Sequence, residues 1–90
     1  MKLVVTIIGQ DKIGIISTVS NILAANKINI LSVNQNIMHG FFNMVMLAEM
    51  TDRNAISIKE LQQILKEKGQ EMGLEIKVQH QDIFNVMYDV

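Results

Sequence analysis

Segment 9–15 of the chain, with the sequence GQDKIGI, carries the residue types best suited to binding a small ligand. It lies between an apolar stretch and a helical pattern, so free backbone amides and the helix dipole at its end favour an anion. Gly14 has no side chain and leaves room for a ligand, while the Asp11 carboxylate could accept hydrogen bonds from an ammonium group. Amides for a carboxylate and Asp11 for an ammonium together suit a free amino acid.

A structural interpretation of the same residues competes with ligand binding. Asp11 could cap the helix and Gly14 could ease packing, and from the residues alone this interpretation is preferred. Asn29 also has two interpretations. Its amide can donate and accept, as the two ends of an amino acid require, or it can be a turn residue between a helix and a strand.

The remaining residues give little indication of metal binding or catalysis. His39 and His80 are the only histidines, lie far apart in the sequence and have no carboxylate at ligand spacing. The chain has no cysteine, which excludes disulfides, iron–sulfur clusters and zinc fingers, so we expect neither a metal nor a cofactor. The only arginine, Arg53, is expected to be a solvated loop charge or a subunit contact. The seven methionines are expected to pack a core or an adaptable interface.

The elements that would position segment 9–15 follow from hydrophobic periodicity. The predicted strands are 3–8, 29–38, 41–50 and 74–80, and the predicted helices are about 14–26 and 57–73. Gly9 is expected to end the first strand, and the dipeptide His39-Gly40 predicts a hairpin turn. Ser57 followed by Glu60 matches the capping box of a helix.

This order of elements predicts an α+β fold: a ferredoxin-like βαββαβ sandwich with a four-stranded antiparallel sheet and two helices on one face. Asp82 could cap a short C-terminal tail helix that brings Ile83, Phe84 and Met87 together. Both alternating residue sets of the strand 41–50 are largely apolar, which implies burial on both of its faces. We expect a second copy of the chain to cover part of the face without helices, giving a homodimer.

Composition limits the classes of protein to which the chain can belong. Ninety residues fit one domain, 1–90, and 49% hydrophobic residues against 19% charged residues indicate a folded globule. The net charge of −1 supplies no attraction to a phosphate backbone or an anionic membrane, so we expect neither as a partner. No export signal and no apolar run of transmembrane length is visible, and with no cysteine this indicates a cytoplasmic protein.

Segment 9–15, with Asn29-Ile30 opening the next strand, resembles the ACT domain, a small amino-acid-binding regulatory module. The tail sequence IFNVMY at 83–88 and the length of the chain resemble the bacterial stand-alone ACT proteins called UPF0237. Those are similar to the ACT halves of the glycine cleavage system transcriptional repressor. The resemblance covers essentially the whole chain. It implies a ferredoxin-like fold that pairs its sheets or edges into dimers, with ligands where the first loop meets a neighbouring domain's strand. Carried over residue by residue, the implied ligand-binding residues are Gln10, Asp11, Lys12, Ile13, Gly14, Ile15 and Asn29.

Two non-enzymatic functions remain open: a regulatory homodimer that binds a small amino acid at its interface, and a protein–protein interaction or dimerisation module without a small-molecule ligand. Enzymatic activity is not expected. An acylphosphatase-like enzyme would need an arginine in the first loop, which has only Lys12, and no Ser-His-Asp or Cys-His set is present. An RNA-recognition module would need stacking aromatics where Asn43 and Met46 stand. The sequence names neither the ligand nor the regulated partner.

Overall fold

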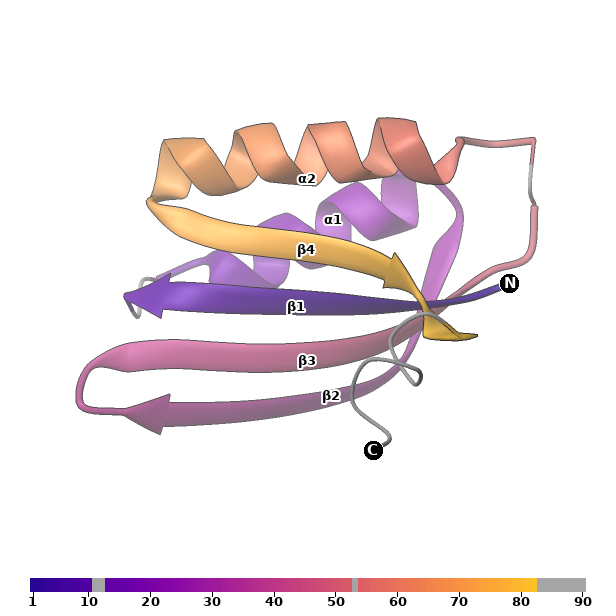
Figure 1. Ribbon diagram of the computed structural model, residues 1–90. Coiled ribbons are helices and arrows are strands. Elements are labelled where there is room, and N and C mark those ends of the chain that lie inside the picture. The colour runs from indigo at the N-terminus through magenta and orange to yellow at the C-terminus, as the bar shows by residue number, and fades with distance from the viewer. Residues whose placement is uncertain (11–12, 53, 83–90) are drawn as a thin grey trace.

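The computed structural model describes residues 1–10, 13–52 and 54–82. Its elements follow the order β1 (Lys2–Gln10), α1 (Ile15–Ala25), β2 (Ile28–Met38), β3 (Phe41–Met50), α2 (Ile58–Met72) and β4 (Leu74–His80). The four strands form one antiparallel sheet in the order β2-β3-β1-β4. Both helices lie on the same face of this sheet (Figure 1). The predicted ferredoxin-like fold is therefore confirmed, while the residues assigned to the tail helix, 83–87, lie outside the described part of the chain.

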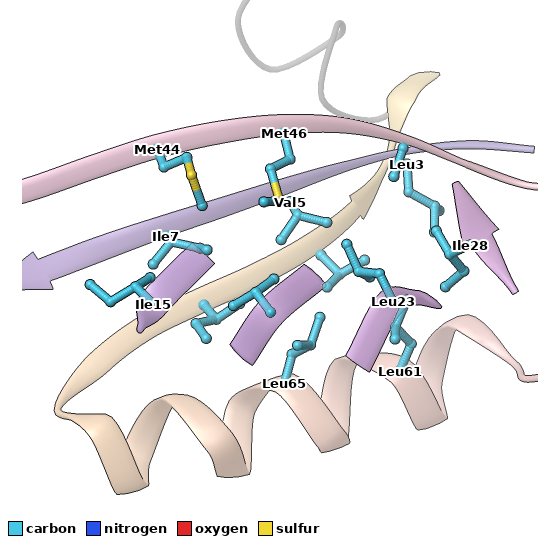
Figure 2. Close-up of a cluster of buried hydrophobic side chains, with 14 of the residues drawn as sticks. Leu3, Val5, Ile7, Ile15, Leu23, Ile28, Met44, Met46, Leu61 and Leu65 are labelled. Atoms are coloured by element: carbon cyan, nitrogen blue, oxygen red, sulfur yellow. The ribbon is translucent and has the colours of Figure 1, made fainter. Parts of the chain in front are cut away.

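The core fills the space between the sheet and the two helices. Alternate residues of the central strands β1 and β3 point toward the helices, and each helix contributes one apolar stripe. Among the described residues, no polar or charged side chain is buried. The fully enclosed side chains include Leu3, Val5, Ile7, Ile15, Leu23, Met44, Met46, Leu61 and Leu65 (Figure 2).

Helix α2 begins and ends where the sequence predicts. The Ser57 hydroxyl accepts a hydrogen bond from the backbone N–H of Glu60 at 3.1 Å and donates one to the Glu60 carboxylate at 3.0 Å. The first bond is the N-cap half of the capping box and satisfies a backbone amide that would otherwise lack a partner, while the second joins the two side chains. The helix ends at Met72. Gly73 follows it, and β4 begins at the next residue, Leu74.

Strand β1 is longer than predicted, because Gly9 does not end it. Gly9 pairs with Phe42 on one side and with Leu74 on the other, and pairing with β3 continues to Gln10. A Cβ atom added at Gly9 would lie 2.5 Å from Cδ2 of Leu74. The glycine therefore allows a close approach of β4 inside the sheet, which is one of the known uses of glycine within a strand.

The face of the sheet opposite the helices is only partly apolar. Along β3, the residues facing the helices are buried, but Phe41 and Val45 on the opposite face are exposed. The prediction that β3 is buried on both faces is therefore not met within the described residues of one chain. No helix of the described residues is long and apolar enough to cross a membrane.

Candidate functional site

The start of α1 has a backbone conformation that favours glycine. Gly14 is the N-cap residue and has φ 88°, in the left-handed region that side chains with a Cβ rarely adopt. Space is not the reason for this glycine, since the nearest atom to an added Cβ would be Ser17 Oγ at 3.9 Å. The prediction that Gly14 leaves room for an approaching group is consistent with this open surrounding.

The first amides of α1 lack the side-chain cap that α2 has. Gly14 supplies no side-chain oxygen, and the first turn contains no acidic residue. The first hydrogen bond of the helix runs from the Thr18 amide to the Gly14 carbonyl at 3.0 Å, and Ser17 Oγ donates to the same carbonyl at 3.2 Å. Among the described residues, the amides of the three residues before Thr18 have no acceptor within the helix, as is usual for the first turn of a helix.

These amides border a hollow that we call the α1–β2 hollow. It has a volume of about 310 Å³ and lies on the helix-covered side of the sheet, between the first turn of α1 and the strands β2 and β3. Its lining residues are Gly14, Ile15, Ile16, Ser17, Gln35, Ile37 and Phe42. Two of the predicted site residues, Gly14 and Ile15, therefore line an open concave surface.

The other predicted site residues differ in where they lie. Gln10 is exposed at the end of β1, opposite Phe41, and Ile13 is fully exposed just before α1. Both are therefore at the same end of the sheet as the α1–β2 hollow, although neither lines it. Asp11 and Lys12 lie outside the described residues.

Asn29 lies at the opposite end of the same chain. It pairs with Glu49, which pairs with Lys2 at the start of β1, whereas the hollow lies near the end of β1. At about 3.3 Å per residue, the eight steps from Lys2 to Gln10 span about 26 Å. One chain therefore does not bring Asn29 to segment 9–15.

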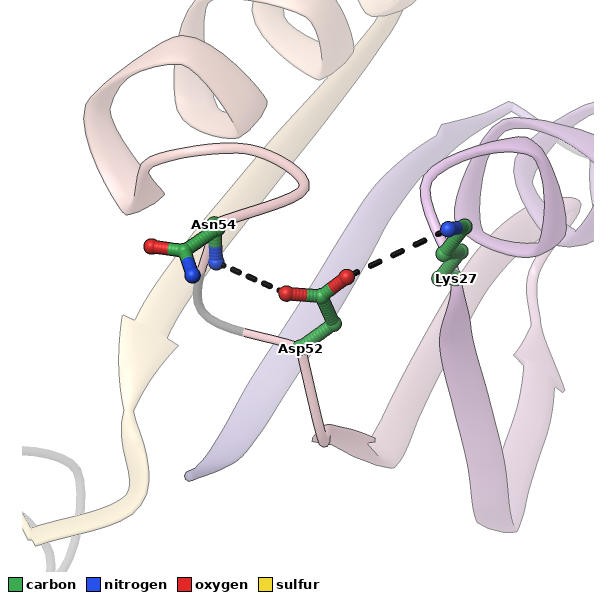
Figure 3. A network of polar contacts seen from close by, with 3 residues as sticks. All are labelled: Lys27, Asp52 and Asn54. Carbon is green, nitrogen blue, oxygen red and sulfur yellow. Dashed lines mark hydrogen bonds and ion pairs between the residues drawn. The ribbon is translucent and has the colours of Figure 1, made fainter.

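Asn29 is an exposed residue near the start of β2, at the end of the sheet where two loops are joined by an ion pair. Lys27 Nζ lies 3.9 Å from Asp52 Oδ2, and the other oxygen of Asp52 accepts a bond from the Asn54 backbone N–H at 3.0 Å (Figure 3). Both charged side chains are exposed, so this ion pair contributes little stability. It links the connection between α1 and β2 to the one between β3 and α2.

The predicted site does not include three residues that line the hollow: Gln35, Ile37 and Phe42. The register places Gln35 opposite Met44 and Ile37 opposite Phe42, so all of them face the helix side of the sheet. In β2 and β3, alternate residues face the same side of the sheet. This alternation could have identified the three residues once α1 was known to lie over these strands.

The two edge strands of the sheet differ in how well they are protected. On β4, Gln62 Nε2 donates to the Val78 carbonyl at 2.7 Å, and Lys77 and Glu75 form an ion pair at 3.3 Å. Strand β2 has no charged residue in its sequence and exposes Val33 and Ile37. A long uncharged edge of this kind is a template for pairing with another strand.

A second hollow lies at the same end of the sheet, beside the hairpin turn between β2 and β3. It has a volume of about 420 Å³ and is lined by Ile8, Asn36, His39, Phe41, Phe42 and Asn43. It does not contact the start of α1. Within the described residues, no cluster of three or more histidine, aspartate or glutamate side chains could hold a metal ion.

These features define the chain first as a small α+β module of ferredoxin-like fold, with an uncapped helix start beside an open sheet edge. The profile of the ACT domain family matches residues 1–79, so the chain belongs to the ACT domain family. A UPF0237 protein of Clostridium perfringens is 44% identical to it over 90 residues, covering the whole of both chains. The predicted membership of the UPF0237 group is thereby confirmed, and the chain is an ACT domain regulatory module.

Solved structures agree with this assignment. An ACT domain protein from Streptococcus pneumoniae is 28% identical, with a TM-score of 0.82 and coverage of 98% of both chains. A protein described as a glycine cleavage system transcriptional repressor shares the fold with a TM-score of 0.74 at 24% identity. That match covers 87% of this chain but only 44% of the other, so this fold forms part of a longer protein there.

Proposed function

We propose that this chain is a homodimeric regulatory module that binds a free amino acid at the interface between its two copies. The observation that carries the proposal is the uncapped start of α1, which opens onto the α1–β2 hollow beside an unprotected edge strand. The amides at the start of α1 are suited to an α-carboxylate, because a helix start concentrates donors and positive potential. Asp11, which the sequence puts three residues before Gly14, is proposed to accept from the ammonium group.

The edge strand β2 supports the dimeric part of the proposal. If two copies pair antiparallel through β2 about a two-fold axis near Val33, Asn29 of one copy comes close to Ile37 of the other. Ile37 lines the α1–β2 hollow. This pairing would give Asn29 a role in the site although the two regions lie at opposite ends of one chain, and each dimer would contain two equivalent sites.

The proposed dimer is tested by measuring its mass and by introducing a charged residue on the edge strand β2. Light scattering of the wild type is expected to give about 20 kDa, twice the chain mass of 10.2 kDa. Val33→Lys is expected to return the mass to that of one chain, because a lysine on an edge strand opposes strand pairing. Val33 is 45% exposed, so the substitution leaves the fold of the chain in place.

Val45→Lys is the matched control, since Val45 is 37% exposed and lies on the face of the sheet opposite the helices. We expect it to remain a dimer. A wild type at the mass of one chain at micromolar concentration contradicts the homodimer. A dimer broken by Val45→Lys but not by Val33→Lys would mean that the sheet face, and not the β2 edge, forms the interface.

Amino-acid binding is tested by a thermal-shift screen of the dimer against the common amino acids at millimolar concentration. A ligand at a hundred times its Kd stabilises the folded state by about 2.7 kcal/mol. For a domain of this size, that corresponds to a Tm increase of at least about 10 °C. Asp11→Ala is expected to abolish the increase and to leave the dimer mass unchanged.

Asp52→Ala is the control for this substitution, because Asp52 is an exposed loop aspartate near the opposite end of the sheet. We expect it to keep the full ligand-induced increase in Tm. If Asp11→Ala binds as tightly as the wild type, the binding site is elsewhere. If no amino acid raises Tm, the protein–protein interaction module without a ligand becomes the better hypothesis.

A further inference from the structure

The α1–β2 hollow is lined by neutral side chains. Four of its seven lining residues are apolar, Ile15, Ile16, Ile37 and Phe42, and none of the seven can carry a charge. Of the two polar side chains, Ser17 donates its hydroxyl hydrogen to the Gly14 carbonyl. This leaves Gln35 as the polar side chain of the lining that is free of any hydrogen bond among the described residues.

We propose that the ligand of this module is an amino acid with an aliphatic side chain, such as valine, leucine, isoleucine or methionine. This inference rests on the proposed function, since it takes the α1–β2 hollow as the amino-acid site. The backbone groups of the ligand lie at the amides that begin α1. Its side chain lies against Ile37 and Phe42, the two apolar residues that β2 and β3 contribute to the hollow.

Charge separates this class from acidic and basic amino acids. A carboxylate or ammonium placed against Ile16, Ile37 and Phe42 loses part of its water, and none of the seven lining residues offers a countercharge. Aspartate, glutamate, lysine and arginine are therefore expected to bind much more weakly than an aliphatic amino acid of similar size.

Size separates the class from the smallest amino acids. Each CH₂ group of the ligand that binding removes from water contributes about 0.8 kcal/mol, which raises the affinity by a factor of about four. Leucine has three more side-chain carbons than alanine, so it is expected to bind tighter by on the order of tenfold or more. The hollow, at about 310 Å³, is near the lower limit for small-molecule sites and fits one amino acid.

Titration calorimetry of the dimer with leucine, valine, methionine, alanine, serine, glutamate and lysine tests this assignment. We expect measurable heats for the first three, binding at least about tenfold weaker for alanine and serine, and none for glutamate and lysine. If serine, glutamate or lysine binds most tightly, the aliphatic assignment is wrong while the proposed function stands. If none of the common amino acids binds, the proposed function itself fails and this inference fails with it.

Ile37→Asn provides a second readout within the hollow. Ile37 is 54% exposed, so the substitution changes the lining without removing a core side chain. We expect the affinity for leucine to fall by about tenfold and the ratio of leucine to alanine affinity to fall with it. Val45→Asn, a similar change on the other face of the sheet, is expected to alter neither. An unchanged ratio in Ile37→Asn would place the ligand's side chain away from β2 and overturn the assignment.

Discussion

Leu65→Ala is expected to lower the free energy of unfolding by about 2–5 kcal/mol. Leu65 is fully buried at the centre of α2, against the other core side chains between the helices and the sheet (Figure 2). Removing its isobutyl group takes away buried apolar contacts and leaves a cavity that a close-packed interior fills only in part. For a chain of this length, Tm in a thermal melt should fall by about 10 °C or more.

Ile64→Ala is the matched control because Ile64 is the preceding residue on the same helix and is 38% exposed. Its truncation should change the free energy of unfolding by less than about 1 kcal/mol, as substitutions at partly exposed positions do. Equal losses for the two variants would mean that α2 does not pack on the sheet through the face that contains Leu65. A small loss for both would mean that the core is loosely packed.

Gly69→Ala is expected to destabilise the chain by about 1–3 kcal/mol, although alanine is intrinsically the better helix former by about 1 kcal/mol. A Cβ at position 69 would lie 2.7 Å from the carbonyl oxygen of Leu74 and 3.1 Å from Ile76 Cγ1. The nearer atom belongs to the backbone of β4, so it cannot move aside as the end of a side chain can. Chemical denaturation of the purified variant measures the sign of the change.

Gln70→Ala is the matched control, because it places an alanine in the same turn of α2 at an exposed position. It should be neutral or slightly stabilising, because alanine replaces a residue of lower helix propensity without a new contact. If Gly69→Ala is also stabilising, then helix propensity outweighs the contact, and α2 can shift away from β4 at little cost.

Much of this fold could be predicted from local sequence signals. Helix α2 begins at a Ser57 and Glu60 pair and ends before Gly73, and each of these signals acts through backbone groups within a few residues. The alternation of residues 74–80 identified β4 with its buried side chains, because one face of that strand contacts the core. Such signals need no knowledge of distant parts of the chain.

The errors arose where a residue's role depends on a distant neighbour. Gly9 was predicted to end β1, but its contact with Leu74 shows that it serves the pairing of β1 with β4. The helical spacing of residues 15–23 places Ile16 on the same apolar stripe as Ile15, yet Ile16 is 41% exposed in the structure. Neither fact follows from periodicity alone.

The candidate site shows the same division between local and distant information. The start of α1 at Gly14 was predicted from a local pattern, and the structure shows its uncapped amides. The contributions of Gln35 and Ile37 required the register between β2 and β3, which the sequence does not specify. Asn29 could be placed far from the hollow only when the order of the strands was known.

The pairing of the first strand with the last has a consequence for how the chain folds. Strands β2 and β3 are joined by the two residues His39 and Gly40, so their contacts are local and close quickly. Strand β1, by contrast, lies between β3 and β4, and Leu3 pairs with His80 near the other end of the chain. Because closing a long loop has a larger entropic cost than closing a short one, the β2–β3 hairpin can form before β1 is in place. Strand β1, one of the two central strands, completes its pairing only when the C-terminal strand β4 is also in place, so we expect its docking to be slower than closure of the hairpin.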